Sequence, residues 1–304
     1  MPLLPPIPNG RSTRRNSVSR DQTALLLSSH VPSMGTPARH RRRRLGRVSD
    51  VKANFASLFR SLVTALVLLL AWHITVLIFE PAPFILPGPL RVLEALGTNR
   101  SYLFTNALVT ASEILLGLLL GSLLGIASAL FLASSALARR WLLPLLVISQ
   151  ALPVFAIAPL LVVWFGYGLG SKIVMTTIII FFPVASAFLD GLQRTEPGLL
   201  DLARLAGASR FQTLRLLRAP AAIPSLGSGL RVAAAVAPIG AVVGEWVGAS
   251  SGLGYVMLHA NARAQVDILF AALVILGCLA AALWFAVDVL VARAVPWANE
   301  NKPA

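Results

Sequence analysis

Six long apolar segments dominate the sequence and constrain its fold more than any other feature. Each is close to the roughly 20 residues that an α-helix needs to cross the hydrocarbon core of a bilayer. Hydrophobic residues make up 57% of the 304-residue chain and charged residues only 12%, about half the charged share of a soluble domain. The sequence therefore predicts an all-α, polytopic membrane bundle of six transmembrane helices. The segments lie at about residues 58–79, 104–133, 141–165, 172–190, 225–249 and 267–292.

Glycines and prolines inside these segments predict how the helices pack. Gly117, Gly121 and Gly125 form two overlapping GxxxG steps in the second segment, a spacing that lets helix backbones approach closely. Each proline removes one backbone hydrogen bond from its helix. We therefore expect kinks in the third, fourth and fifth helices, at Pro153, Pro159, Pro183 and Pro238.

A strongly basic stretch precedes the first apolar segment. Residues 1–52 hold 11 of the 26 Lys and Arg and two of the 12 Asp and Glu, so they carry +9 of the net charge of +14. Residues 1–55 have no apolar period, which predicts a disordered cytoplasmic tail. Binding of anionic lipid or nucleic acid by the tail, and a later start at Met34, are alternatives. The membrane domain is expected over 56–295, followed by a short cytoplasmic tail over 296–304.

The positive charges between the spans predict the orientation. With six spans, the loops on the same side as the basic tail carry more Arg than the opposite loops, and the basic side of a membrane protein faces the cytoplasm. Both termini are therefore expected to be cytoplasmic. The inner residues are Arg139, Arg140, Arg194, Arg204, Arg210, Arg215, Arg218 and Arg293; the outer residues are Arg91, Arg100, Lys172 and Arg263.

The long inner loop at residues 191–224 is predicted to contain two short helices. Thr195 can cap the first helix, and Gly207 can end it in the left-handed conformation. Ser209 and Gln212 have the spacing of a capping box for the second helix. The loop therefore has the local signals of a helix–glycine–helix elbow.

The second helix of this loop is expected to stop at Pro220 and Pro224, where the next span begins. The elbow, residues 195–212, would be apolar on one face and would carry arginines on the other. Such an elbow can fit a groove on a partner protein. It can equally lie on the membrane surface as an amphipathic hairpin, and local chemistry leaves both interpretations open.

The same loop carries a motif. Its segment Asp201-Leu-Ala-Arg-Leu-Ala-Gly207, followed by Leu217-Arg-Ala-Pro220, resembles the signature of ABC-importer permeases: Glu-Ala-Ala, three residues, Gly, nine residues, Ile, one residue, Leu-Pro. The spacing from the glycine to the proline is kept. Leu202 and Ala219 depart from the pattern. The positions that match it or replace it conservatively are Asp201, Ala203, Gly207, Leu217 and Pro220.

Other segments, in the same order and topology, are similar to the nitrate/sulfonate/taurine-type permease family. They cover an outer entry segment at 86–93, the end of the third span at 159–166 and an outer segment at 248–255. The resemblance extends from about residue 55 to 293. It implies the fold of a type I ABC-importer permease in the bacterial inner membrane.

The resemblance also implies a division of labour. Two permease copies, expected to form a homodimer, would line the pathway in the lipid bilayer. Two copies of a separate ATPase would bind below, and an extracytoplasmic binding protein would deliver the substrate. The elbow would seat in a groove of the ATPase. The coupling residues implied are Asp201, Ala203, Gly207, Ser209, Leu217 and Pro220.

The sequence itself lacks the motifs of an ATPase or a metalloenzyme. A P-loop requires GxxxxGK[ST], and the nearest string, at 166–173, lacks that order and falls in a predicted outer loop. The four His are scattered, and His73 is better interpreted as a partner in a helix–helix hydrogen bond. We therefore expect no enzymatic activity, no cofactor, no metal and no nucleic-acid partner.

Polar residues inside or beside the spans are the candidates for the substrate pathway, because such residues are costly in lipid. The alternative for each is an interfacial or inter-helix polar contact. A carboxylate next to Trp246 could hydrogen-bond an amino-bearing ligand. The candidates are Glu113, Gln150, Glu245, Trp246 and Asn261.

The substrate is predicted only from resemblance. The strings at 112–117, 244–248 and 258–263 are similar to the branch associated with thiamine-precursor pyrimidines. Sulfonate, taurine or nitrate-type anions are the alternative within the family. A secondary transporter or channel that works alone is the alternative outside it.

Overall fold

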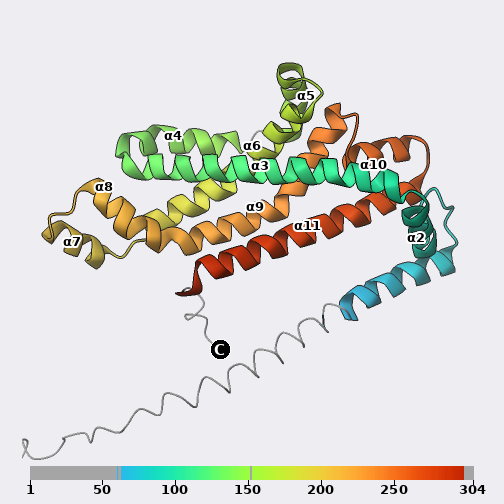
Figure 1. Cartoon of the computed structure of the whole chain (residues 1–304), viewed down its shortest axis with the longest axis horizontal. Coiled ribbons are helices and arrows are strands. Elements are labelled where there is room, and N and C mark those ends of the chain that lie inside the picture. Colours follow the sequence, from blue (N-terminus) through green and yellow to red (C-terminus); the bar gives the residue numbers. More distant parts are fainter. Residues whose placement is uncertain (1–59, 61–62, 151–152, 298–304) are drawn as a thin grey trace, which may run out of the picture. The chain divides into compact units, whose positions relative to one another are not determined.

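The computed structural model describes residues 60, 63–150 and 153–297. The chain divides into two units, residues 1–64 and 65–304, and the following description concerns the second. All regular secondary structure in the described residues is helical (Figure 1), which confirms the predicted all-α class. The expected basic tail at 1–55 lies outside the described residues, as does 298–304.

Four helical runs are long and apolar enough to cross a membrane. Each contains or closely matches one predicted span, so these four predictions are confirmed. Only 11% of the most apolar window of the last run is buried within the chain, as expected for a helix that contacts lipid or another subunit. The runs are α3 (Arg100–Ser134), α6 (Leu169–Gln193), Arg210–Gly248, which includes α9 (Ala219–Gly248), and α11 (Val266–Ala294).

The third predicted span is broken into two helices, and the first is described only in part. In place of one helix over 141–165, the structure has α4 (Ala136–Ser149) and α5 (Val154–Phe165), bent by 97°. Pro153 precedes α5 in an extended conformation and has no N–H to continue the ladder of α4. The described part of the first predicted span is an apolar helix, Val63–Phe79, which ends at the predicted residue; residues 58, 59, 61 and 62 lie outside the described residues. The described chain thus has four spans, or five if the bent pair is one.

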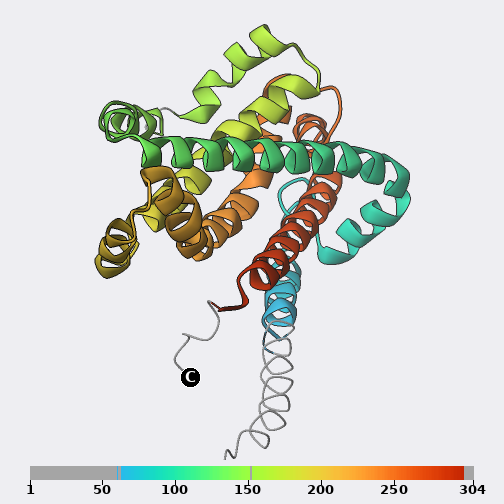
Figure 2. The same ribbon diagram turned by 60° about the vertical axis from the view of Figure 1, so that its left-hand side comes forward.

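Helix α6 packs between α3 and α9 (Figures 1 and 2). A Cβ atom added at Gly117, Gly121 or Gly125 of α3 would lie 2.5–2.9 Å from atoms of α6. The predicted GxxxG packing face is therefore confirmed. On the other side of α6, a Cβ atom added at Gly240 of α9 would lie 2.8 Å from Thr176. Small residues on both neighbours bring three backbones close together.

Two short helices lie outside both the predicted spans and the inner loop at 191–224. They are α2 (Pro89–Thr98) and α10 (Leu253–Ala262). Both contribute to a buried apolar cluster with α3 and α11, through residues that include Val92, Leu103, Leu253 and Ala271. Helix α10 therefore docks on the ends of the long helices, where its first turn contacts polar side chains.

Candidate functional site

The elbow begins with α7 (Pro197–Leu205), whose proline lies in the first turn as predicted. The predicted cap is wrong, because Glu196 and not Thr195 is the N-cap residue, and it makes no side-chain cap bond. The hydroxyl of Thr195 instead donates to the carbonyl oxygen of Leu192 at 3.4 Å, and Thr195 is buried. The hydroxyl thus satisfies the end of α6 rather than the start of α7.

The turn of the elbow follows the local prediction. Gly207 has φ +74°, the left-handed region in which glycine is favoured. The Gln212 amide N–H donates to Ser209 Oγ at 3.2 Å, and the Ser209 N–H donates to Gln212 Oε1 at 2.8 Å. This reciprocal pair is the predicted capping box, and it begins α8 (Arg210–Thr213).

The two prolines after α8 do not end the helix as expected. Helix α8 continues through the π-helical turn η1 (Leu214–Arg218) into α9, and Pro220 lies in the first turn of α9. At the junction the Ala219 N–H donates to the Leu214 carbonyl, five residues back. Elbow and span therefore form one helical run of 39 residues, Arg210–Gly248.

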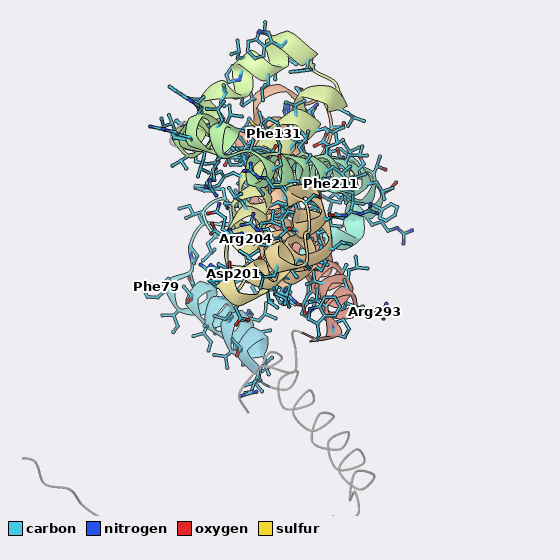
Figure 3. All side chains as sticks on the ribbon, turned by 90° about the vertical axis from the view of Figure 1, so that its left-hand side faces the viewer. Phe79, Phe131, Asp201, Arg204, Phe211 and Arg293 are labelled. Atoms are coloured by element: carbon cyan, nitrogen blue, oxygen red, sulfur yellow. The ribbon has the colours of Figure 1, made fainter. Side chains whose placement is uncertain are left out.

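The elbow presents large apolar side chains to its surroundings. Leu202, Leu205 and Phe211 are 63%, 87% and 68% exposed. Asp201 and Arg204 form an exposed ion pair of 2.8 Å, and Figure 3 shows them with Phe211. Such apolar exposure on a short loop is a feature of partner-binding surfaces. The remaining predicted coupling residues are partly buried (Ala203, Leu217) or exposed (Gly207, Ser209, Pro220).

A second group of predicted residues meets at the start of α10. Glu245 of α9 accepts a hydrogen bond from Thr110 Oγ1 of α3 at 2.6 Å, and its other oxygen accepts one from the Gly254 N–H. Asn106 Oδ1 accepts from the Gly252 N–H at 2.7 Å. Thr110 Oγ1 accepts from the next N–H, that of residue 253, at 2.7 Å. Side chains of α3 and α9 thus satisfy the free N–H groups of α10.

Glu113 lies beside this cap and is fully buried. It is within electrostatic range of Glu245 and Lys172. Its carboxyl group lies next to that of Glu245 and accepts no hydrogen bond from an N–H or hydroxyl group of the described residues. The Lys172 ammonium group donates to the carbonyl oxygens of Tyr167 and Gly168 at 2.7 and 2.9 Å. Three ionisable side chains therefore meet inside the helix bundle, where such groups are rare.

The other three pathway candidates do not join this cluster. Gln150 is exposed at the end of α4, and Asn261 is exposed near the end of α10. Trp246 is 45% exposed, whereas Glu245 before it is 1% exposed, so the two side chains occupy different faces of α9. The structure brings together only Glu113 and Glu245.

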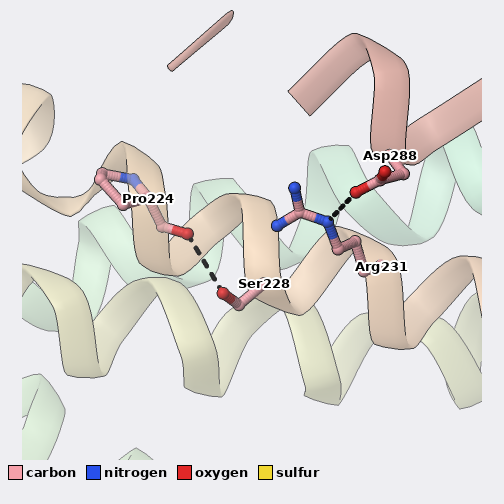
Figure 4. Close-up of polar contacts among 4 residues, drawn as sticks. All are labelled: Pro224, Ser228, Arg231 and Asp288. Atoms are coloured by element: carbon pink, nitrogen blue, oxygen red, sulfur yellow. Dashed lines mark hydrogen bonds and ion pairs between the residues drawn. The ribbon is translucent and has the colours of Figure 1, made fainter. Parts of the chain in front are cut away.

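One ion pair inside the predicted spans was not among the candidate residues chosen from the sequence. Arg231 Nε of α9 donates to Asp288 Oδ1 of α11 at 2.6 Å (Figure 4). Both residues are about one-third exposed, with side-chain exposures of 32% and 38%. Their positions inside the predicted fifth and sixth spans are the sequence feature that could have identified them, because charged residues are rare there. The pair links α9 to α11.

Among residues 60, 63–150 and 153–297, no group of three or more His, Cys, Asp and Glu side chains is arranged to hold a metal ion.

The comparison with known families identifies the family of this helical membrane chain. Residues 113–299, more than half of the chain, match the family described as "binding-protein-dependent transport system inner membrane component". The chain belongs to this family. It is therefore an ABC-transporter permease and a multi-pass membrane protein, as its sequence motifs predicted.

Individual relatives agree with that assignment. The permease is 52% identical over 236 residues to a probable ABC transporter permease protein of Haemophilus influenzae, covering 78% of this chain and 96% of the relative. It is 36% identical to the formylaminopyrimidine transport permease protein ThiX of Halalkalibacterium halodurans, covering 78% and 94%. It is 30% identical to the taurine transport permease TauC of Escherichia coli, covering 79% and 90%.

A solved structure has the same fold. The inward-facing methionine ABC transporter MetNI matches with a TM-score of 0.58 and 22% identity, covering 65% of this chain and 98% of that chain. This likeness identifies the permease as a type I importer-like helical bundle.

Proposed function

We propose that this permease imports a small organic solute and receives the energy of ATP hydrolysis from a separate ATPase through its elbow. The observation that carries the proposal is the elbow itself. The left-handed conformation of Gly207 and the Ser209–Gln212 capping box fix the shape of the elbow. The side chains of Leu205 and Phe211 are exposed. A rigid loop with exposed apolar side chains is suited to a partner's groove.

The proposed movement follows from the continuity of the helix behind the elbow. The run Arg210–Gly248 would be ~58 Å long at 1.5 Å per residue. One end carries α8 of the elbow, and the other carries Glu245 in the cap of α10. A shift imposed on the elbow would therefore reach α10 as a rigid-body displacement. This coupling supports alternation between two states, which requires that the ATPase bind them differently.

In the complete transporter, we infer two permease copies as a homodimer and two ATPase copies. Both termini and the elbow would face the cytoplasm, and an extracytoplasmic binding protein would dock on the opposite side. ATP would be hydrolysed by the ATPase and not by this chain. The elbow residues Asp201, Ala203, Gly207 and Ser209, together with Leu217 and Pro220, are the proposed coupling residues.

The test is uptake by reconstituted permease with and without its ATPase. We expect the ATPase to co-purify with the permease and uptake to require ATP. Phe211→Asp, which places a charge on the exposed elbow, should abolish co-purification, whereas Phe131→Asn on the exposed surface of α3 serves as a control away from the elbow. Uptake without any ATPase would identify a secondary transporter and refute the proposal.

For the substrate, we propose a thiamine-precursor pyrimidine. The support is the 36% identity to ThiX over 78% of the chain, compared with 30% to TauC. Glu113, Gln150, Glu245, Trp246 and Asn261 remain the proposed pathway residues, and the buried Glu113 carboxyl lies next to that of Glu245. Calorimetry with the cognate binding protein should detect an aminopyrimidine and no taurine. The opposite result would favour sulfonate-type anions.

A further inference from the structure

A cavity of about 560 Å³ lies between the elbow and the turn from α3 to α4. Its volume is in the range of roughly 300–1,000 Å³ that is typical of small-ligand sites. Apolar residues such as Leu132 and Leu214 form part of its wall. The remainder of the wall includes four arginines from four different elements: Arg139, Arg204, Arg210 and Arg218.

The positive charge of this cavity is largely uncompensated. Arg204 is paired with Asp201, but no carboxylate lines the cavity within the described chain. Arg139, Arg210 and Arg218 have no ion-pair partner among the described residues. The Nε atom of Arg218 is buried and has no hydrogen-bond partner there. Arg139, Arg204 and Arg210 are exposed and Arg218 is half-buried. Guanidinium groups gathered around one cavity, one of them with a buried and unpartnered Nε atom, give that cavity the chemistry of an anion site.

The surroundings of the cavity indicate which anion. The first turns of α4 carry exposed apolar side chains next to Arg139, with Leu137 and Trp141 both 69% exposed. Trp is enriched at the membrane–water interface, and Arg is enriched on its cytoplasmic side. A basic pocket between helices at this level binds phospholipid headgroups. Arginine also recognises phosphate through two parallel hydrogen bonds.

We infer that this cavity binds the phosphate headgroup of an anionic phospholipid, whose acyl chains lie along Leu137 and Trp141. The bound lipid would join the elbow, through Arg210, to the α3–α4 turn, through Arg139. It would thereby restrain the segment that we propose to move during transport. Binding itself requires only the membrane location, so it can be tested without the ATPase and independently of the coupling proposal.

The test uses full-length permease purified in neutral detergent, to which phosphatidylglycerol, cardiolipin or phosphatidylcholine is added. Native mass spectrometry counts bound lipid, and thermal unfolding measures stabilisation. We expect both anionic lipids, and not phosphatidylcholine, to bind and raise the unfolding temperature. Each of Arg139→Gln, Arg210→Gln and Arg218→Gln should weaken binding roughly fivefold. Arg215→Gln, in the same helical run but outside the cavity, should leave binding unchanged.

A variant in which Arg139, Arg210 and Arg218 are all replaced by Lys separates the effect of charge from that of guanidinium geometry. It also keeps the test decisive if the Gln variants fail to fold. It should fold and retain partial lipid binding, because Lys keeps the charge but loses the bidentate contact. Equal binding of phosphatidylcholine, or unchanged binding by all Gln variants, would overturn the inference. Stabilisation by inorganic phosphate without a preference for lipid would assign the cavity to a free anion instead. If the Gln substitutions weakened binding of the ATPase but not of lipid, the cavity would be assigned to a protein partner.

Discussion

At the scale of single residues, Gly252 has the most demanding position in the described chain. Its φ is +111°, and an added Cβ would lie 2.2 Å from Glu245 Oε1. Backbone strain and overlap with a buried carboxylate would therefore act together. The start of α10 can be built only with glycine at this point.

We predict that Gly252→Ala lowers the free energy of unfolding by roughly 2–5 kcal/mol. Thermal or denaturant-induced unfolding in detergent measures the loss. The matched control is Gly277→Ala in α11, where nothing lies within 4 Å of the added Cβ and alanine is the better helix former. Equal stability of the two variants would contradict the packing of Glu245 against Gly252.

Glu245 is the second residue whose substitution tests the cap of α10. Glu245→Ala removes the acceptor for Thr110 and for the Gly254 N–H, and each unsatisfied buried group costs about 1–3 kcal/mol. We expect faster hydrogen exchange at the first turn of α10 and a smaller effect for Glu245→Gln, which keeps one acceptor.

Trp246→Ala on the exposed face of α9 is the control for this experiment, since it touches none of these bonds. A purely substrate-binding role for Glu245 would give the reverse pattern. Uptake would then fall in Glu245→Ala while exchange in α10 stayed as in the wild type.

At the scale of elements, the Arg231–Asp288 pair is the polar connection between α9 and α11. Asp288→Asn leaves the Arg231 charge without its partner at 2.6 Å. Because the pair is about one-third exposed, we predict a loss of roughly 1–3 kcal/mol, below that of a fully buried pair.

A double-mutant cycle with Arg231→Met and Asp288→Leu checks this prediction by equilibrium unfolding. The double variant should be more stable than either single variant, because both charges leave the membrane together. Additive losses would mean that the pair contributes no coupling between α9 and α11.

Elements also differ in how far local sequence predicts them. The four long spans and the capping box follow from apolar length and from bonds between neighbours in sequence. Over 141–165 the structure has two helices bent by 97° next to Pro153, where a kink was expected, and hydropathy does not tell whether such a pair crosses the membrane as one span. Pro220 was expected to stop a helix, but the π-helical turn before it continues the run, and no local rule indicates that turn.

At the scale of the whole molecule, the distribution of positive charges predicts the orientation of the chain in the membrane. In a Cys278→Ala background, Ser209→Cys on the elbow and Ser250→Cys after α9 should lie on opposite sides of the membrane. A membrane-impermeant thiol reagent should label residue 250 from the periplasmic side and residue 209 only in inverted vesicles. Labelling of both from one side would contradict the proposed topology.

The sequence by itself determined the all-helical membrane class, four of the spans, the GxxxG face of α3 and the turn at Gly207. These features depend on hydrophobic length and on contacts within a few residues, which a linear pattern contains. The tertiary structure alone decided that Thr110 and Glu245, 135 residues apart, together cap α10. It also paired Arg231 with Asp288 across 57 residues and gathered four arginines around one cavity. Such sites arise only when packing brings distant helices together, because no short stretch of the sequence contains all of their residues.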